Sequence, residues 1–252
     1  MRRPVIAGNW KMHKTSAEAE ELAKALVDHL ADLTDDREVV LCPPFTGLKV
    51  VFEVIKSSPI KLGAQNLHWE KSGAFTGEIS ALMLKDVGCS YVIIGHSERR
   101  TYFCETNSTV NKKIFAALDQ GLIPIVCVGE TLEEREKNQT FEIIERQIKE
   151  GLVGLTPSQA LRLIIAYEPV WAIGTGKTAT PEQANDVHTF IRSLLAKKFN
   201  ETVASGIRIQ YGGSVRPDNI KSLMSQKDID GVLVGGASLD ADSFTKIVKF
   251  KE

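Results

Sequence analysis

The sequence predicts an α/β fold, a single closed (β/α)8 barrel domain that spans residues 1–252. Short apolar runs rich in β-branched residues recur eight times along the chain, and a turn and a helical pattern follow them. No stretch rich in glycine, proline or serine divides the chain, and eight such units in ~250 residues match a barrel. A doubly wound open sheet is the alternative, but the turn at residues 8–11 lacks the GxGxxG pattern of that fold.

Most of the predicted strands are continuous apolar runs, which is the pattern of parallel strands buried on both faces. They cover residues 5–7, 39–42, 60–64, 91–94, 123–128, 163–167, 207–211 and 232–234. Apolar residues at helical spacing predict the helices between them. The clearest helix begins after a cap at Thr180, has Pro181 at its first position and extends to about Lys198. The others are predicted over residues 16–30, 47–55, 79–86, 105–118, 133–152, 217–224 and 240–248.

The chain contains 31 Lys and Arg and 32 Asp and Glu, which gives a net charge of −1. This balance argues against a nucleic-acid partner, which needs a basic surplus, but it allows a small anionic ligand. The apolar stretch after Met1 is too short for a signal peptide, and no apolar run approaches the ~18 residues of a membrane span. Four widely spaced cysteines form no CxxC pair, so we expect no zinc site, reduced thiols and a cytoplasmic location.

Catalytic residues of such a barrel lie at the carboxyl ends of the strands and in the loops that follow. Polar residues at these places in the sequence are Asn9, Lys11, His96 and Glu168. Glycine-rich turns follow the seventh strand, at Gly212-Gly213-Ser214, and the eighth, at Gly235-Gly236. Barrels commonly bind phosphate at these two turns through backbone N–H groups. The pattern therefore predicts a site for a phosphorylated ligand at one face of the barrel.

Several of these residues also have a structural interpretation. His96 could be a structural histidine, and Glu168 could simply be an ion-pair partner. The run Glu98-Arg99-Arg100 is expected to form a structural ion-pair cluster. Cys104 is expected to be a small buried hydrophobe, with a reactive thiol as the alternative, and Cys127 is expected to belong to the core.

The loop after the sixth strand has the composition of a mobile lid, with a rigid start, a bulky anchor and a small-residue tip. Its predicted residues are Pro169, Val170, Trp171, Ala172, Ile173, Gly174, Thr175, Gly176 and Lys177. An ordinary connecting loop is the alternative, but this segment exceeds the usual ~2–6 residues.

Five segments together resemble the triosephosphate isomerase family, in order along the whole chain. They are residues 9–12 (NWKM), 91–100 (YVIIGHSERR), 166–177 (AYEPVWAIGTGK), 211–215 (YGGSV) and 233–237 (LVGGA). The resemblance implies the TIM barrel fold and the interconversion of dihydroxyacetone phosphate and glyceraldehyde 3-phosphate in glycolysis and gluconeogenesis. It implies no metal and no organic cofactor.

The same resemblance implies a role for each catalytic position. Glu168 would be the base that moves a proton between adjacent carbons, and His96 would donate a hydrogen bond to the substrate oxygens as a neutral imidazole. Lys11 would supply positive charge, and Asn9 an orienting hydrogen bond. Ile173 and Leu233 resemble the apolar pair that crowds the base. Phosphate would be bound by backbone N–H groups of Gly174, Ser214, Gly235 and Gly236, and by the Ser214 hydroxyl.

The segment Gln65–Glu78 resembles the family's protruding dimer loop. We expect its Leu67, Trp69 and Phe75 to be exposed, and apolar side chains of this kind need a partner surface. The resemblance places Thr76 near Asn9 and Glu98 of a second copy, so we expect a homodimer. A loop folded back onto its own barrel is the alternative.

Two other function classes compete with an isomerase. A phosphate-binding barrel without catalytic activity would show a broken catalytic set, whereas Lys11, His96 and Glu168 are all present. A different barrel enzyme of the indole or pentose-phosphate pathways would need other acids and bases at the strand ends.

Overall fold

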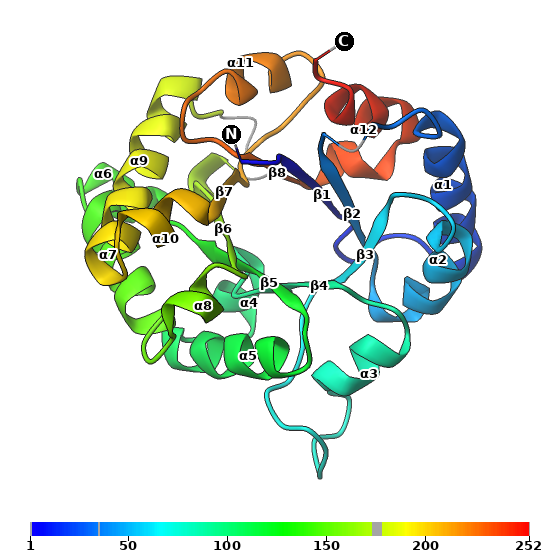
Figure 1. Ribbon diagram of the computed structural model, residues 1–252, viewed down its shortest axis with the longest axis horizontal. Helices are drawn as coiled ribbons and strands as arrows, with labels where there is room; N and C mark the ends of the chain where they lie inside the picture. Colours follow the sequence, from blue (N-terminus) through cyan, green and yellow to red (C-terminus); the bar gives the residue numbers. More distant parts are fainter. Residues whose placement is uncertain (1, 35, 173–177, 252) are drawn as a thin grey trace.

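The computed structural model describes residues 2–34, 36–172 and 178–251, which form a closed barrel of parallel strands within a ring of helices (Figure 1). Each strand pairs with its neighbours in sequence, and β1 closes the barrel against β8. The strands are β1 (Val5–Asn9), β2 (Glu38–Cys42), β3 (Lys61–Ala64), β4 (Tyr91–Ile94), β5 (Ile123–Val128), β6 (Ile164–Tyr167), β7 (Arg208–Tyr211) and β8 (Gly231–Val234). The predicted (β/α)8 barrel is confirmed.

The helices of the described residues lie outside the strands (Figure 1). They are α1 (Ser16–His29), α2 (Leu48–Ile55), α3 (Ala81–Asp86), α4 (Ser97–Tyr102), α5 (Asn107–Asp119), α6 (Leu132–Glu136), α7 (Thr140–Gly151), α8 (Pro157–Ala160), α9 (Pro181–Lys198), α10 (Glu201–Gly206), α11 (Ile220–Met224) and α12 (Ala241–Val248). None of these described helices has the length and apolar character needed to cross a membrane.

Alternate residues of each strand face the two sides of the barrel wall. Val5 and Ala7 of β1 belong to a buried cluster inside the barrel, together with Ile125 of β5. Ile6, between them, belongs to the larger cluster that lies between the strands and the helices. Because both faces are buried, the strands lack the polar alternation of a sheet with a solvated face.

Helix starts follow the side-chain capping that the sequence encodes. At α9, the predicted cap is confirmed: the Thr180 side chain accepts from the Gln183 N–H, and the Gln183 side chain accepts from the Thr180 N–H. The single helix predicted over residues 133–152 is wrong, because α6 and α7 are separate helices. Asn138 lies between them with φ of 59°, a left-handed conformation that ends an α-helix.

Candidate active site

Glu168 directly follows β6 and is buried, with 2% of its surface exposed. Its Oε2 accepts a hydrogen bond of 2.9 Å from the backbone N–H of Ser97, and its Oε1 lies 2.9 Å from Nε2 of His96. Oε1 is thus within hydrogen-bond distance of the imidazole. A side chain at position 212 would disturb this packing, because a Cβ on Gly212 would lie 2.9 Å from Cγ of Glu168. The carboxylate is thus fixed through one oxygen while the other faces the imidazole.

His96 is the N-cap residue of α4, and its Nδ1 accepts a hydrogen bond of 3.2 Å from the backbone N–H of Glu98. A nitrogen that accepts carries no proton, so the proton of the neutral ring is on Nε2, the atom that faces Glu168. This tautomer follows from the hydrogen-bond geometry. It presents an N–H donor at the carboxyl end of the barrel.

The pKa values of Glu168 and His96 are coupled. Burial raises the pKa of Glu168, but His96, the Ser97 N–H and Lys11 lower it, and the net result lies below its ordinary value. Burial lowers the pKa of His96, whereas the carboxylates of Glu168 and Glu98 raise it, and the net result lies above its ordinary value. Both net shifts depend on the 2.9 Å approach of the two groups. Separating them would leave burial as the dominant influence and raise the pKa of Glu168.

Lys11 has φ of 53°, a left-handed conformation that is costly for a residue other than glycine. Two side chains hold this backbone: Oδ1 of Asn9 accepts from the Lys11 N–H at 3.0 Å, and Nε2 of Gln65 donates to the Lys11 carbonyl at 2.9 Å. The Lys11 ammonium lies 2.6 Å from Oε1 of Glu98. Asn9 therefore acts on Lys11 directly, and the strained backbone sets where the ammonium lies.

One cavity of about 370 Å³ collects these groups with the two glycine turns. It is lined by Asn9, Lys11, His96, Glu168, Gly212, Gly213, Ser214, Val215, Arg216, Leu233, Gly235, Gly236 and Ala237. Every predicted catalytic and substrate-binding position is in this set except Gly174, which lies outside the described residues. The turn after β7 is fixed by Asn219, whose Nδ2 donates to the Ser214 carbonyl at 3.0 Å and whose Oδ1 accepts from the Arg216 N–H at 2.8 Å.

The start of the predicted lid is anchored to a buried carboxylate. Residues Val170–Ala172 form a 3₁₀ turn after Pro169, and Nε1 of Trp171 donates to Oε1 of Glu130 at 2.9 Å. The Tyr167 hydroxyl donates to the same oxygen at 3.1 Å, and Arg135 forms a 3.1 Å ion pair with it. The remaining predicted lid residues Ile173, Gly174, Thr175, Gly176 and Lys177 lie outside the described residues.

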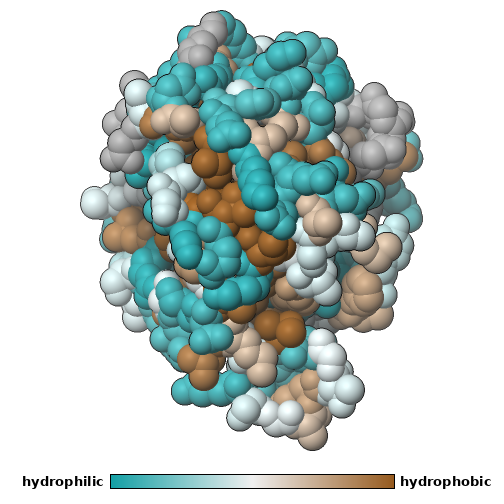
Figure 2. Space-filling model, turned by 90° about the vertical axis from the view of Figure 1, so that its right-hand side faces the viewer, coloured by the Kyte–Doolittle hydropathy of each residue, from teal (hydrophilic) through white to brown (hydrophobic). Residues whose placement is uncertain are grey.

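The loop Gln65–Glu78 protrudes from the barrel between β3 and α3, at the bottom of Figures 1 and 2. Figure 2 shows its tip in white and tan, less hydrophilic than most of the surface above it. Phe75 is 43% exposed and Thr76 is exposed. The expectation of an exposed leucine is wrong, because Leu67 is fully buried, and Trp69 is partly buried.

Two other expectations are corrected. Glu98 does not form an ion pair with Arg99 or Arg100 in the described structure but with Lys11, which the barrel brings from β1. Arg99 instead pairs with Glu105. Cys104 is exposed rather than buried, because it follows α4 in a surface loop, whereas Cys127 is buried as predicted.

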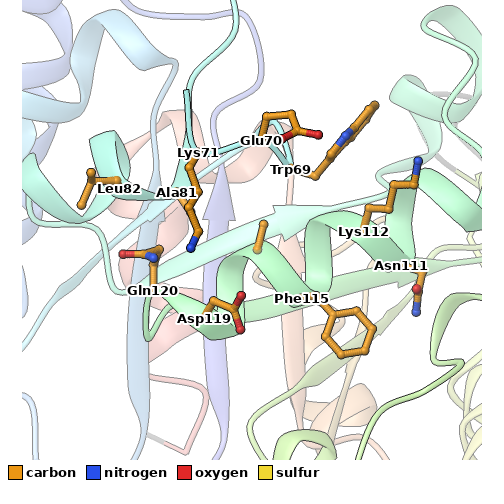
Figure 3. A pocket seen from close by; sticks show the side chains of 11 residues that line it. Trp69, Glu70, Lys71, Ala81, Leu82, Asn111, Lys112, Phe115, Asp119 and Gln120 are labelled. Atoms are coloured by element: carbon orange, nitrogen blue, oxygen red, sulfur yellow. The ribbon is translucent and has the colours of Figure 1, made fainter. Parts of the chain in front are cut away.

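Another cavity of about 330 Å³ lies away from this site, between the start of the protruding loop, α3 and α5 (Figure 3). Trp69, Leu82 and Phe115 contribute its apolar wall, while Lys71 and Asp119 add charges of opposite sign. None of the predicted catalytic residues lines it. Among the described residues, no group of three or more His, Cys, Asp and Glu side chains is placed to bind a metal ion.

The sequence analysis missed Glu130, Gln147 and Asn219 as supports of the site. Glu130 follows β5 by two residues, so the search for polar residues after each strand could have found it. Gln147, in the middle of α7, bonds to the backbone of Gly129, and no local signal distinguishes it from other polar residues on a helix. Asn219 carries no signal beyond its nearness to a glycine turn.

The chain matches known proteins over nearly its whole length. The sequence profile of the triosephosphate isomerase family matches residues 4–251. The triosephosphate isomerase of Carboxydothermus hydrogenoformans is 59% identical over 99% of both chains, and that of Moorella thermoacetica is 58% identical over 100% of both. A crystal structure of triosephosphate isomerase from Bartonella henselae superimposes with a TM-score of 0.89 at 41% identity and covers 99% of both chains.

Proposed function

The chain belongs to the triosephosphate isomerase family, and on that premise we propose how its own residues interconvert dihydroxyacetone phosphate and glyceraldehyde 3-phosphate. The observation that carries the proposal is the single cavity lined by Asn9, Lys11, His96, Glu168 and the two glycine turns. A base, an N–H donor, a cation and an anion-binding turn are the groups that an enediolate of a phosphorylated triose requires.

Glu168 removes a proton from one carbon of the substrate and returns it to the adjacent carbon, while the substrate's hydroxyl proton moves to the former carbonyl oxygen. Its Oε1 lies 2.9 Å from Nε2 of His96 in the same cavity, and this oxygen takes up the proton once the substrate lies between the two groups. A substrate that enters between Glu168 and His96 separates them, and burial then raises the pKa of the carboxyl and strengthens the base. Nε2–H of His96 donates to the substrate oxygen, which gains negative charge as the proton leaves carbon.

Lys11 and the glycine turns bind the phosphate. Ser214, Gly235 and Gly236 line the cavity, and their backbone N–H groups and the Ser214 hydroxyl would bind the phosphate as at the phosphate sites of other barrels. Gly174 of the predicted lid would add a further N–H. Leu233 contributes apolar surface beside the base, which keeps water from it.

We further propose that residues 1–252 act as one domain within a cytoplasmic homodimer. Phe75 and Thr76 at the tip of the protruding loop share a hollow with Phe103, which is 63% exposed. Apolar surface of this kind fits a second copy of the chain. Four free cysteines fit a reducing compartment. Sedimentation equilibrium tests the dimer: Phe75→Asp should shift it toward a monomer, and an unchanged dimer would refute this interface.

The function is tested by a coupled assay that measures glyceraldehyde 3-phosphate formed from dihydroxyacetone phosphate. We expect turnover far above background without added metal or cofactor. A folded protein with no turnover would refute the isomerase. If that protein still bound a phosphate-bearing substrate analogue, the alternative of a binding barrel without catalysis would take its place.

A further inference from the structure

The backbone beside the catalytic base is held by a glutamine from a helix outside the barrel. Oε1 of Gln147, in α7, accepts from the Gly129 N–H at 2.8 Å, and Nε2 of the same side chain donates to the Gly129 carbonyl at 3.0 Å. One primary amide thus binds both polar groups of a single residue. Gly129 directly follows β5, where pairing with the next strand ends.

Gly129 lies against the peptide group of Glu168. A Cβ built on Gly129 would overlap the Glu168 carbonyl oxygen, so the two backbones are in the closest contact that glycine permits. The residues on either side of Gly129 continue this contact: the Val128 carbonyl accepts from the Glu168 N–H at 2.8 Å, and the Glu130 carbonyl accepts from the Val170 N–H at 3.1 Å. The backbone at the end of β5 therefore contacts and hydrogen-bonds both the residue that carries the base and the start of the predicted lid.

We propose that Gln147 is a positioning residue for the isomerase reaction, which acts on Glu168 through Gly129. This inference rests on the proposed function. Among the described residues, the amide of Gln147 supplies the hydrogen bonds given for the polar groups of Gly129, so without it this peptide can shift or rotate. A shift there moves the backbone of Glu168, and a displacement of ~1 Å at a catalytic group can cost ~100-fold in rate. The phosphate turns after β7 and β8 are supported by other groups and should be unaffected.

The proposal predicts a selective loss of kcat. Gln147→Met keeps the length and helix propensity of the side chain but removes both hydrogen bonds. We expect kcat to fall by about tenfold or more, with KM and the affinity for a phosphate-bearing inhibitor changed by less than about threefold. Gln147→Glu keeps the acceptor for the Gly129 N–H but loses the donor to the carbonyl, so its loss should be intermediate. Arg146→Ala, an exposed neighbour in α7, is the matched control.

The measurements separate positioning from stability. kcat and KM are measured well below the melting temperature of each variant, and thermal unfolding is recorded beside them. A variant that unfolds at lower temperature but keeps the full kcat would overturn the proposal, as would a loss that appears only in KM. Absence of turnover in the unmodified protein would refute the proposed function instead, so the two failures are distinguishable.

Discussion

The two ends of the barrel both bury charged side chains, but they partner them differently. At the amino end, Asp230 forms ion pairs with Arg2 at 2.5 Å and Arg192 at 2.7 Å and accepts from the Ile209 N–H at 2.9 Å. At the carboxyl end, Glu168 has one oxygen fixed by a backbone N–H, and the other lies 2.9 Å from Nε2 of His96, with which it lines the cavity.

The difference separates stabilising charges from reactive ones. A buried carboxylate with several fixed partners contributes to a unique packing, and removing one of its partners is costly. A buried carboxylate whose second oxygen contacts one titratable side chain at a cavity can exchange that partner for a ligand. The amino end of this barrel should therefore determine stability, and the carboxyl end activity.

The largest expected effect comes from Glu168→Gln at the carboxyl end. The amide keeps the shape of the side chain but cannot accept the proton, so kcat should fall on the order of 10³-fold, about 4 kcal/mol in the activation barrier. The melting temperature should fall slightly, because the folded protein holds the pKa of Glu168 below its ordinary value and so stabilises the charged carboxylate. Steady-state kinetics and calorimetry check both. A mild loss of kcat would mean that another group is the base.

The opposite result is expected from Asp230→Asn at the amino end. The neutral amide weakens both ion pairs, and the free energy of unfolding should fall by about 3 kcal/mol with kcat changed by less than about twofold. Denaturant titration measures the loss. Glu133→Gln, which breaks the exposed pair with Lys137, is the control and should leave stability unchanged. A large change in kcat for Asp230→Asn would contradict the inference that the amino end determines stability and the carboxyl end determines activity.

A smaller, pH-dependent effect is expected from His188, which is fully buried beside the same amino-end cluster. Its Nδ1 lies 3.0 Å from the Asp228 carbonyl, and burial lowers its pKa from 6.5 to about 4. The pKa of His188 is lower in the folded protein than in the unfolded chain. The contribution of the neutral imidazole to the free energy of unfolding is therefore complete above pH 6.5 and is lost as the pH falls toward 4. The loss approaches about 3 kcal/mol. His188→Asn should remove this part of the pH dependence of unfolding, and an unchanged pH profile would refute it.

The sequence was sufficient to predict the barrel because burial on both faces of each strand leaves continuous apolar runs that are hard to mistake. It was also sufficient to predict that Lys11, His96 and Glu168 lie together at one end of the barrel, since each is within a few residues of a strand end. The predictions that were wrong concerned contacts between segments that are distant in the sequence. Glu98 stands next to two arginines in sequence, yet its ion-pair partner is Lys11, 87 residues away.

The amide side chains that bind backbone groups around the site could not be predicted from the sequence, because they too contact distant segments. Gln65, Gln147 and Asn219 each bond to two backbone groups near the cavity. A side-chain amide has two N–H donors and a carbonyl acceptor, so one side chain can satisfy two backbone groups where regular pairing ends. Glutamine and asparagine are equally common on solvated surfaces, and only the folded chain shows which of them face inward.

The smallest predicted effect concerns Asn219 and divides the carboxyl end itself. Asn219→Ala removes the hydrogen bonds to Ser214 and Arg216, so the turn that binds phosphate should become less ordered. KM should rise about tenfold, or ~1.4 kcal/mol, with kcat nearly unchanged, because the base is not involved. Asn219→Asp keeps only the bond from the Arg216 N–H and should show a smaller rise. If Asn219→Ala lowered kcat as Gln147→Met is expected to, the base and the phosphate turn would be one coupled unit, and the carboxyl end would not separate into independently supported parts.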